Sequence, residues 1–380
     1  MFCDIRNFTD TTEMLQGDVF RWINSIASVV HGICSDYEGN AVKHVGDAFM
    51  MVWSLPLMKN FDKDLDCDEK EGMEPCDEEE DERARTELRR SRGLQNRTAS
   101  SAELVKKQNK WECQEQAEKC LIAVTKIVIA LTDEYRFLVP ISSSSRALLL
   151  SSGLNRVRIG FGLHAGNAIQ GAIGSHLKVD VTFISKSSEI AEVLESRTKE
   201  YGVPILMSGK YFDLLGKQTK GKCRQVDYDD SKDANVRRFF TFDIDEEAVG
   251  GVKGRAGPGI YSPMTKQGSN GALEGGKEGG SGGRGARGNN NGLKGQYDPR
   301  IWVQEPTLRD VRRKYNVRFL TGWSKAFALY RGAKTLEEWT EAEETMEEIS
   351  TEYADGVAER LRVKCRRVRV GLDNKEGAGN

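Results

Sequence analysis

The sequence predicts an α+β domain whose strands and helices follow one another in a β-α-β-β-α-β order. A short apolar strand opens the chain, and a helical repeat of apolar residues follows it. Two further apolar strands then flank a Gly-Asp turn, which is typical of a hairpin. This order favours helices that cover one face of a mainly antiparallel sheet.

The first half of this pattern is continuous in the sequence. It consists of a strand, a helix-start signal of the Asn-Phe-Thr-Asp type, a long amphipathic helix and a hairpin. These elements are expected at residues 2–6, 7–10, 19–37, and 40–45 with 48–53. The second half resumes with a helix at about 114–135, and its last helix is expected at about 187–201. Its strands are expected at 156–164, 167–173, 179–185, 203–208, 223–228 and 238–243.

Other segments depart from this pattern. Residues 56–112 form a charged insertion, which we expect to be a disordered, solvated loop, with a binding arm as the alternative. Residues 247–298 are a Gly-rich flexible linker, and residues 366–380 are expected to be a disordered tail. Between them, residues 299–365 carry aromatic residues at helical spacing and are expected to form a small helical hairpin. The α+β domain then spans residues 1–246.

Composition narrows the classes of function. The formal net charge of −2 gives no general attraction to nucleic acid, and no nucleic-acid partner is expected. The eight cysteines form no C-x-x-C pair, which indicates a reduced, cytoplasmic chain. The chain opens inside the first expected strand, so we expect a truncated N-terminus. A location at the cytosolic face of a membrane, through a missing upstream anchor, is the alternative.

Two aspartates are the candidate catalytic residues. Asp4 ends the first strand, and Asp47 lies in the turn of the neighbouring hairpin. Paired carboxylates suit phosphoryl transfer with two divalent cations, and Mg²⁺ prefers oxygen ligands. The segment Arg6-Asn7-Phe8-Thr9 would present backbone N–H groups to phosphates at a helix N-terminus. Taken singly, each aspartate has an alternative role as a turn former or helix cap.

Several segments resemble the motifs of class III adenylate and guanylate cyclases. Phe2–Thr9 resembles their F-x-D-I-x-x-F-T motif, and Lys43–Phe49 resembles their K-x-x-G-D-x-x hairpin. Val157–Gly166 is similar to their R-x-G-I-H-x-G strand and turn, and Glu195–Ser208 also follows the family. The resemblance implies a ferredoxin-like cyclase catalytic domain. Such a domain is a phosphorus–oxygen lyase that makes a 3′,5′-cyclic nucleotide and pyrophosphate in intracellular signalling.

The resemblance also implies roles for single residues. Asp4 and Asp47 would bind two Mg²⁺ ions, or Mn²⁺, with help from the Ile5 carbonyl. Lys43 and Thr182 fall where the family reads the base. A lysine donates and a threonine accepts, which suits N1 and N6 of adenine, so ATP is favoured over GTP. Ordinary solvent-facing strand positions are the alternative for both base readers.

The sequence departs from the family motif at two positions. Where the family has an asparagine and an arginine, this chain has Glu189 and Val193. Loss of such donors lowers the rate about 10²–10³-fold and about 10³–10⁵-fold, respectively. Lys232 falls where the family has a triphosphate-binding lysine.

In this family the active site lies between two catalytic domains. We therefore expect the chain to be the metal-donating half of a homo- or heterodimer with a second cyclase domain. A catalytically dead dimerisation module and a guanylate cyclase are the alternatives.

Overall fold

The computed structural model describes residues 1–56, 101–228, 238–245, 298 and 300–377 of the chain. Most of the predicted insertion, the Gly-rich linker and the last three residues lie outside these ranges. No helix in the described part of the chain combines the length and the apolar character needed to cross a bilayer.

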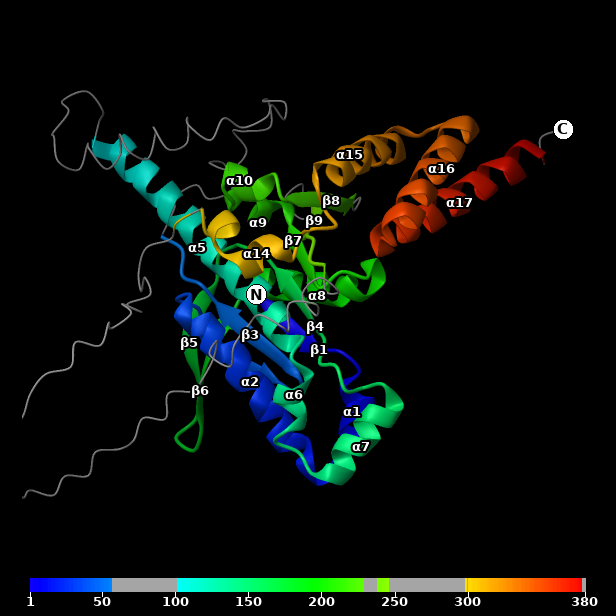
Figure 1. Cartoon of the computed structure of the whole chain (residues 1–380). Helices are drawn as coiled ribbons and strands as arrows, with labels where there is room; N and C mark the ends of the chain where they lie inside the picture. The colour runs from blue at the N-terminus through cyan, green and yellow to red at the C-terminus, as the bar shows by residue number, and fades with distance from the viewer. Residues whose placement is uncertain (57–100, 229–237, 246–297, 299, 378–380) are drawn as a thin grey trace, which may run out of the picture.

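A seven-stranded sheet forms the centre of the fold, in the order β2-β3-β1-β4-β7-β9-β8 (Figure 1). Neighbouring strands are antiparallel except β4 and β7, which are parallel and are joined through α8. The order β2-β3-β1-β4 within a β-α-β-β-α-β chain order confirms the predicted ferredoxin-like α+β fold. The strands are β1 Phe2–Ile5, β2 Asn40–Val45, β3 Ala48–Val52, β4 Ile159–Leu163, β7 Ile205–Ser208, β8 Cys223–Tyr228 and β9 Arg238–Phe242.

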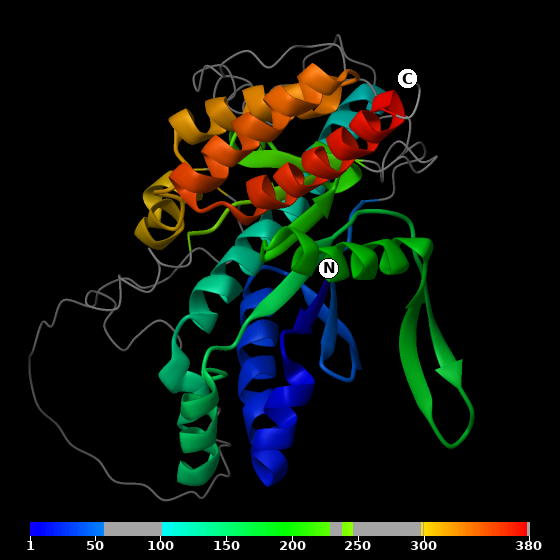
Figure 2. The ribbon, with the colours of Figure 1, turned by 90° about the vertical axis from the view of Figure 1, so that its right-hand side faces the viewer.

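A second, two-stranded sheet lies beside β2 of the first. It consists of β5 (Ile169–Gly174) and β6 (Val179–Ile184), which pair as an antiparallel hairpin. Figure 2 shows this hairpin extending away from the body of the molecule beyond the start of α8.

Some helices connect the strands, and others follow the last strand. The connecting ones are α1 Phe8–Leu15, η1 Gln16–Asp18, α2 Val19–Asp36, α5 Ser101–Leu131, α6 Glu134–Leu138, α7 Ser143–Ser152, α8 Lys186–Tyr201, α9 Gly209–Leu214 and α10 Lys217–Lys220. After the linker come α13 Ile301–Gln304, α14 Pro306–Asp310, α15 Val317–Gly332, α16 Leu336–Tyr353 and α17 Gly356–Gly377.

The sheet is covered on both faces, whereas the sequence predicted helices on one face. Alternate residues of a strand point to opposite faces. In β7, Ile205 and Met207 join the core formed with α2 and α5, and Leu206 joins a second core with α8. The prediction was wrong because it did not use the continuous apolar run of β7, which is typical of a strand buried on both faces.

Helix α8 lies directly on strand β4. A Cβ at Gly162 would lie 1.9 Å from the Ala191 backbone oxygen, so only glycine permits this approach. The contact fixes α8 on the same face of the sheet as the side chain of Asp4, because Cys3 and Ile5 on either side of it join the opposite core.

Helix α5 begins at Ser101, so the predicted insertion ends earlier than expected. Residues 101–112 form the first turns of this helix, whereas the sequence predicts a start near Gln114. Side chains such as Lys107 and Lys110 are exposed there. The predicted start was wrong because the first turns of α5 are polar, and a polar helical segment has no apolar periodicity.

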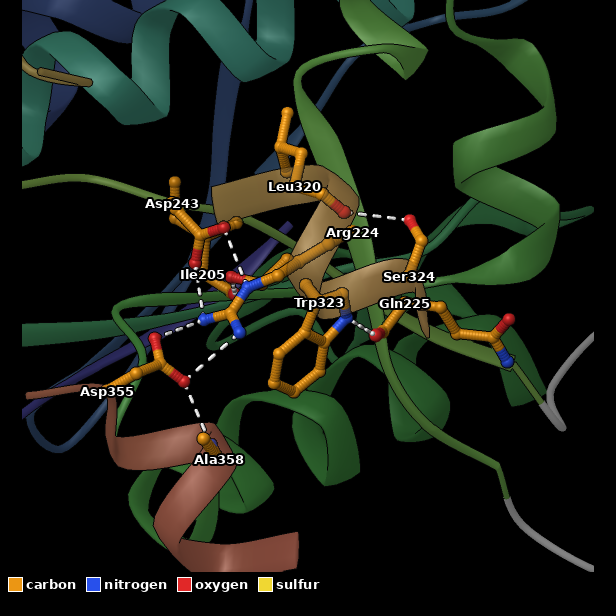
Figure 3. Close-up of polar contacts among 10 residues, drawn as sticks. Ile205, Arg224, Gln225, Asp243, Leu320, Trp323, Ser324, Asp355 and Ala358 are labelled. Carbon is orange, nitrogen blue, oxygen red and sulfur yellow. Dashed lines mark hydrogen bonds and ion pairs between the residues drawn. The ribbon is translucent and has the colours of Figure 1, made fainter. Parts of the chain in front are cut away.

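The C-terminal helices pack on the seven-stranded sheet and not only on one another. Phe319 and Trp323 of α15 share a core with Leu206 and Val226 of the sheet. Figure 3 shows the polar centre of this contact, where Arg224 of β8 bonds residues from both parts. The predicted helical hairpin is therefore a set of three longer helices that completes the second face of the sheet.

The predicted disordered tail at 366–380 is wrong for its first twelve residues, since α17 continues to Gly377. Arg366 and Arg369 of this segment bond Glu343 of α16 at 2.7 and 2.9 Å. The basic run is ordered because an acidic helix lies beside it. Helices α16 and α17 are separated at Ala354, which adopts a left-handed conformation.

Candidate active site

Asp4 and Asp47 lie together at the edge where β1 meets the β2–β3 turn. Asp4 pairs in register with Ala48, the residue that follows Asp47. The carboxyl groups of Asp4 and Asp47 are close enough to interact electrostatically. Burial raises the pKa of Asp47, and the neighbouring Asp4 carboxyl group raises it further. Two carboxyl groups in this relation favour a bound cation, which relieves their repulsion.

The Asp4 side chain faces α8 and is 19% exposed. Its neighbours at the same level of the sheet are Ala48 on β3 and Gly160 on β4, and neither carries a long side chain. Lys199 of α8 reaches into this space, and its Nζ lies 3.4 Å from Asp4 Oδ2. Sequence reasoning missed Lys199, because only the packing of α8 across the sheet brings the two residues together.

Arg6 does not take the role that the sequence predicted. Its backbone N–H donates to the Arg158 carbonyl at 2.8 Å, so this group is not available to a phosphate. Its guanidinium group donates to Thr198 and lies 3.2 Å from Glu195. The predicted phosphate-binding role of Arg6 is therefore wrong. The pairing of β1 with β4 continues one residue beyond Ile5 and takes up the Arg6 backbone N–H. The Arg6 side chain joins β1 to α8.

The rest of the predicted phosphate loop forms the start of α1. Asn7 is the N-cap in a left-handed conformation with φ 54°, and no side chain caps the helix. The Phe8 ring stacks on Trp22 at 6.4 Å between centroids, so this side chain belongs to the packing. Thr9 is exposed. Backbone N–H groups of the first turn remain the part of this loop that suits an anion.

The two predicted base readers lie on neighbouring elements. Lys43 is exposed on β2, opposite Met50 and beside a bulge. Thr182 is half-buried on β6, opposite Gly171. Strands β2 and β6 contact each other, so the fold brings both residues to the same side of the domain.

Glu189 and Val193 occupy the exposed face of α8. Glu189 is in the first turn of the helix, and 51% of Val193 is exposed. Both side chains are available to a neighbouring molecule. The predicted triphosphate ligand Lys232 lies outside the described residues.

The donor groups at Asp4 fit a hard divalent cation. Two carboxylates supply oxygen ligands, and the carbonyl of Ile5 follows Asp4 directly in β1. Mg²⁺ commonly takes one or two carboxylates and completes its shell with water and substrate phosphates. The chemistry of these residues therefore fits Mg²⁺ or Mn²⁺.

The chain belongs to the family of adenylate and guanylate cyclase catalytic domains, which its residues 1–237 match. An adenylate cyclase from Anabaena cylindrica is 21% identical over 210 residues, which are 55% of this chain and 28% of that protein. Adenylate cyclase 1 of Rhizobium meliloti (strain 1021) is 32% identical over 95 residues, 25% of this chain and 12% of that protein. The chain thus spans less than a third of these relatives.

Solved structures with a similar fold include a bacterial light-regulated adenylyl cyclase (TM-score 0.39, 16% identity, 63% of this chain and 50% of that chain). The guanylate cyclase domain of RhGC from Catenaria anguillulae, in complex with GTP, has a TM-score of 0.37 at 14% identity, over 63% and 91% of the two chains. For the adenylyl cyclase CyaB from P. aeruginosa the TM-score is 0.36 at 16% identity, over 63% and 89%.

Proposed function

We propose that this chain takes part in converting a nucleoside triphosphate, with ATP favoured, into a 3′,5′-cyclic nucleotide and pyrophosphate. The observation that carries the proposal is the pairing of β1 with β3, which places Asp4 beside Asp47 near the uncapped start of α1. Family membership supports the reaction class.

In this reaction the ribose 3′-oxygen bonds to the α-phosphorus while the bond from that phosphorus to the leaving pyrophosphate breaks. The proton of the hydroxyl leaves to solvent. Asp4, Asp47 and the Ile5 carbonyl would hold the divalent cations. When bound there, Mg²⁺ would lower the pKa of the hydroxyl and offset the charge of the pyrophosphate. The first N–H groups of α1 are placed to bind phosphate oxygens.

The preference for ATP rests on Lys43 and Thr182. An ammonium group that donates to adenine N1 and a hydroxyl that accepts from N6 match adenine better than guanine. Both curated relatives are named adenylate cyclases, which supports the same choice. Competition between ATP and GTP tests it, and a preference for GTP would contradict the assignment of these two residues.

The β5–β6 hairpin supports a dimeric arrangement. Its apolar side chains are exposed at a density that favours contact with another protein surface. We propose a second cyclase domain as that partner, with this chain as the metal-donating half. The exposed residues are Ile169 (74%), Ile173 (55%), Leu177 (85%), Val179 (64%) and Ile184 (62%).

A second candidate function is a catalytically inactive regulatory module of the same fold. It is favoured by Glu189 and Val193, which provide neither the amide nor the positive charge expected near the α-phosphate. Under this alternative the domain binds its partner without turning over nucleotide.

The full chain distinguishes these functions in two measurements. Metal-dependent binding of a non-cyclisable ATP analogue should be present in the wild type and lost in Asp4→Asn. The cyclase rate of the chain alone should be low, and the double variant Glu189→Asn, Val193→Arg should raise it by about 10²-fold or more. Absence of metal-dependent binding favours the inactive module. A normal cyclase rate of the unmodified chain would contradict the half-site assignment.

A further inference from the structure

Lys199 lies beside the predicted metal ligands, although it belongs to none of the motifs. It is the basic residue of the last turn of α8, with its Nζ 3.4 Å from Asp4 Oδ2. Burial raises the pKa values of Asp47 and Glu195, and the charge of Lys199 lowers both of them. One ammonium group thus acts on all three carboxyl groups of this corner.

The ion pair between Lys199 and Asp4 is partly exposed, chiefly through the lysine. The lysine side chain is 53% exposed and that of Asp4 is 19% exposed. Ala48 and Gly160 flank Asp4 on the sheet. The Arg6 guanidinium group and the Glu195 carboxylate occupy the space above Gly160. An ion pair this exposed contributes about 0–1 kcal/mol to stability at most, so the fold does not depend on it.

The backbone that carries Lys199 is fixed on both sides. Thr198, the preceding residue, accepts a hydrogen bond from Arg6 and is buried. Tyr201, two residues later, donates to the buried carboxylate of Asp227. The backbone at Lys199 is therefore fixed, while its side chain reaches solvent. This combination suits a residue whose side chain exchanges one partner for another.

We propose that Lys199 is a further active-site residue, whose ammonium group binds the polyphosphate of the nucleoside triphosphate held at Asp4 and Asp47. This inference rests on the proposed function. A lysine is a compact charge with three donors, which suits phosphate oxygens. A divalent cation and the ammonium group compete for Asp4, so entry of the cation releases Lys199 toward the phosphates. In the proposed dimer, Lys199 supplies positive charge from the subunit that donates the metal ligands. Glu189 and Val193 of the other subunit supply none.

The test compares Lys199→Met and Lys199→Arg with the wild-type full chain. Lys186→Met is the matched control, since Lys186 is an exposed lysine at the other end of α8. Calorimetry measures binding of Mn²⁺ alone, then of inorganic triphosphate and of a non-cyclisable ATP analogue in the presence of Mn²⁺. Methionine is a strong helix former, so α8 should persist, and circular dichroism checks this.

We expect Lys199→Met to weaken both triphosphate ligands by about 10- to 100-fold, the usual effect of losing a charged hydrogen bond. Lys199→Arg should restore most of the binding, and Lys186→Met should match the wild type. Mn²⁺ alone should bind Lys199→Met at least as tightly as the wild type, because a competing cation is gone.

Three outcomes overturn the inference. The first is equal triphosphate binding by Lys199→Met and Lys186→Met. The second is a loss confined to the ATP analogue, which would place Lys199 at the nucleoside. The third is weaker Mn²⁺ binding by Lys199→Met, which would make the lysine a support for Asp4. In all three cases the proposed function stands if Asp4→Asn still abolishes metal-dependent binding. If the wild type shows no such binding, the proposed function itself fails.

Discussion

Arg224 of β8 bonds Asp355, the residue before α17, through two hydrogen bonds of 3.1 and 2.7 Å (Figure 3). The same guanidinium group donates to Asp243 at 2.8 and 2.9 Å. All three side chains are buried. Asp355 also accepts from the Ala358 N–H at 2.8 Å, so it caps α17 while it joins that helix to the sheet.

Asp355→Asn is expected to destabilise the chain by about 3–5 kcal/mol, because it leaves a buried arginine with one carboxylate fewer. Asparagine caps helices as well as aspartate does, so the change isolates the charge. Urea unfolding gives the size of the effect, and hydrogen exchange should show faster opening of α15–α17. Asp298→Asn is the control, since Asp298 pairs with Arg300 at an exposed site. A loss no larger than that of the control would refute the structural role.

The sequence predicts the strands well and this cluster not at all. Apolar alternation and turn residues are local signals, so β8 and the hairpin around Gly46 can be placed from neighbouring residues alone. Nothing local links Arg224 to Asp355, which lies 131 residues away. The same limit applies to Lys199 and Asp4, whereas Asp47 could be paired with Asp4 because adjacent strands carry them.

Gly162→Ala is expected to destabilise the chain by about 1–3 kcal/mol, as overpacking does in well-packed cores. The new Cβ would lie 1.9 Å from the Ala191 backbone oxygen, and a backbone atom cannot turn away. Helix α8 must then move off β4, which also moves Lys199 relative to Asp4.

Thermal unfolding of this variant measures the loss. The control is Gly171→Ala in β5, where no atom lies within 4 Å of the added Cβ. If both variants unfold at the same temperature, close packing of α8 on β4 is not what requires glycine at 162.

Asp18 should contribute a pH-dependent part of the stability. It accepts from the Ser142 N–H at 2.9 Å and from Ser145 Oγ at 2.8 Å, and so joins the start of α2 to the start of α7. The hydrogen bonds from Ser142, followed by that from Ser145, lower the pKa of Asp18 to about 2, from an ordinary value of 3.8. The folded state therefore favours the ionised form.

For an acid with a lowered pKa, the stabilisation is complete above 3.8 and is lost as the pH falls toward 2. The urea midpoint of Asp18→Asn should lie below that of the wild type by a constant amount between pH 7 and pH 5. The difference should shrink as the pH is lowered further. A difference that stays constant down to pH 3 would show that the charge of Asp18 does not matter.

Asp227 joins the end of α8 to the C-terminal helices. Its buried carboxylate accepts from Tyr201 of α8, from Tyr330 of α15 at 3.0 Å and from Lys364 of α17. Removing its charge should weaken three hydrogen bonds at once. Asp227→Asn is therefore expected to cost about 1–3 kcal/mol of stability, the range for hydrogen bonds to charged groups.

The same variant should also affect the candidate active site, because the last turn of α8 carries Lys199. We expect Mn²⁺-dependent binding of inorganic triphosphate to weaken in Asp227→Asn, measured below its unfolding temperature. Glu359→Gln is the control, since Glu359 pairs with Arg362 and accepts from Ser350, neither of which belongs to α8. Loss of stability with unchanged triphosphate binding would show that the C-terminal helices support the fold without positioning α8.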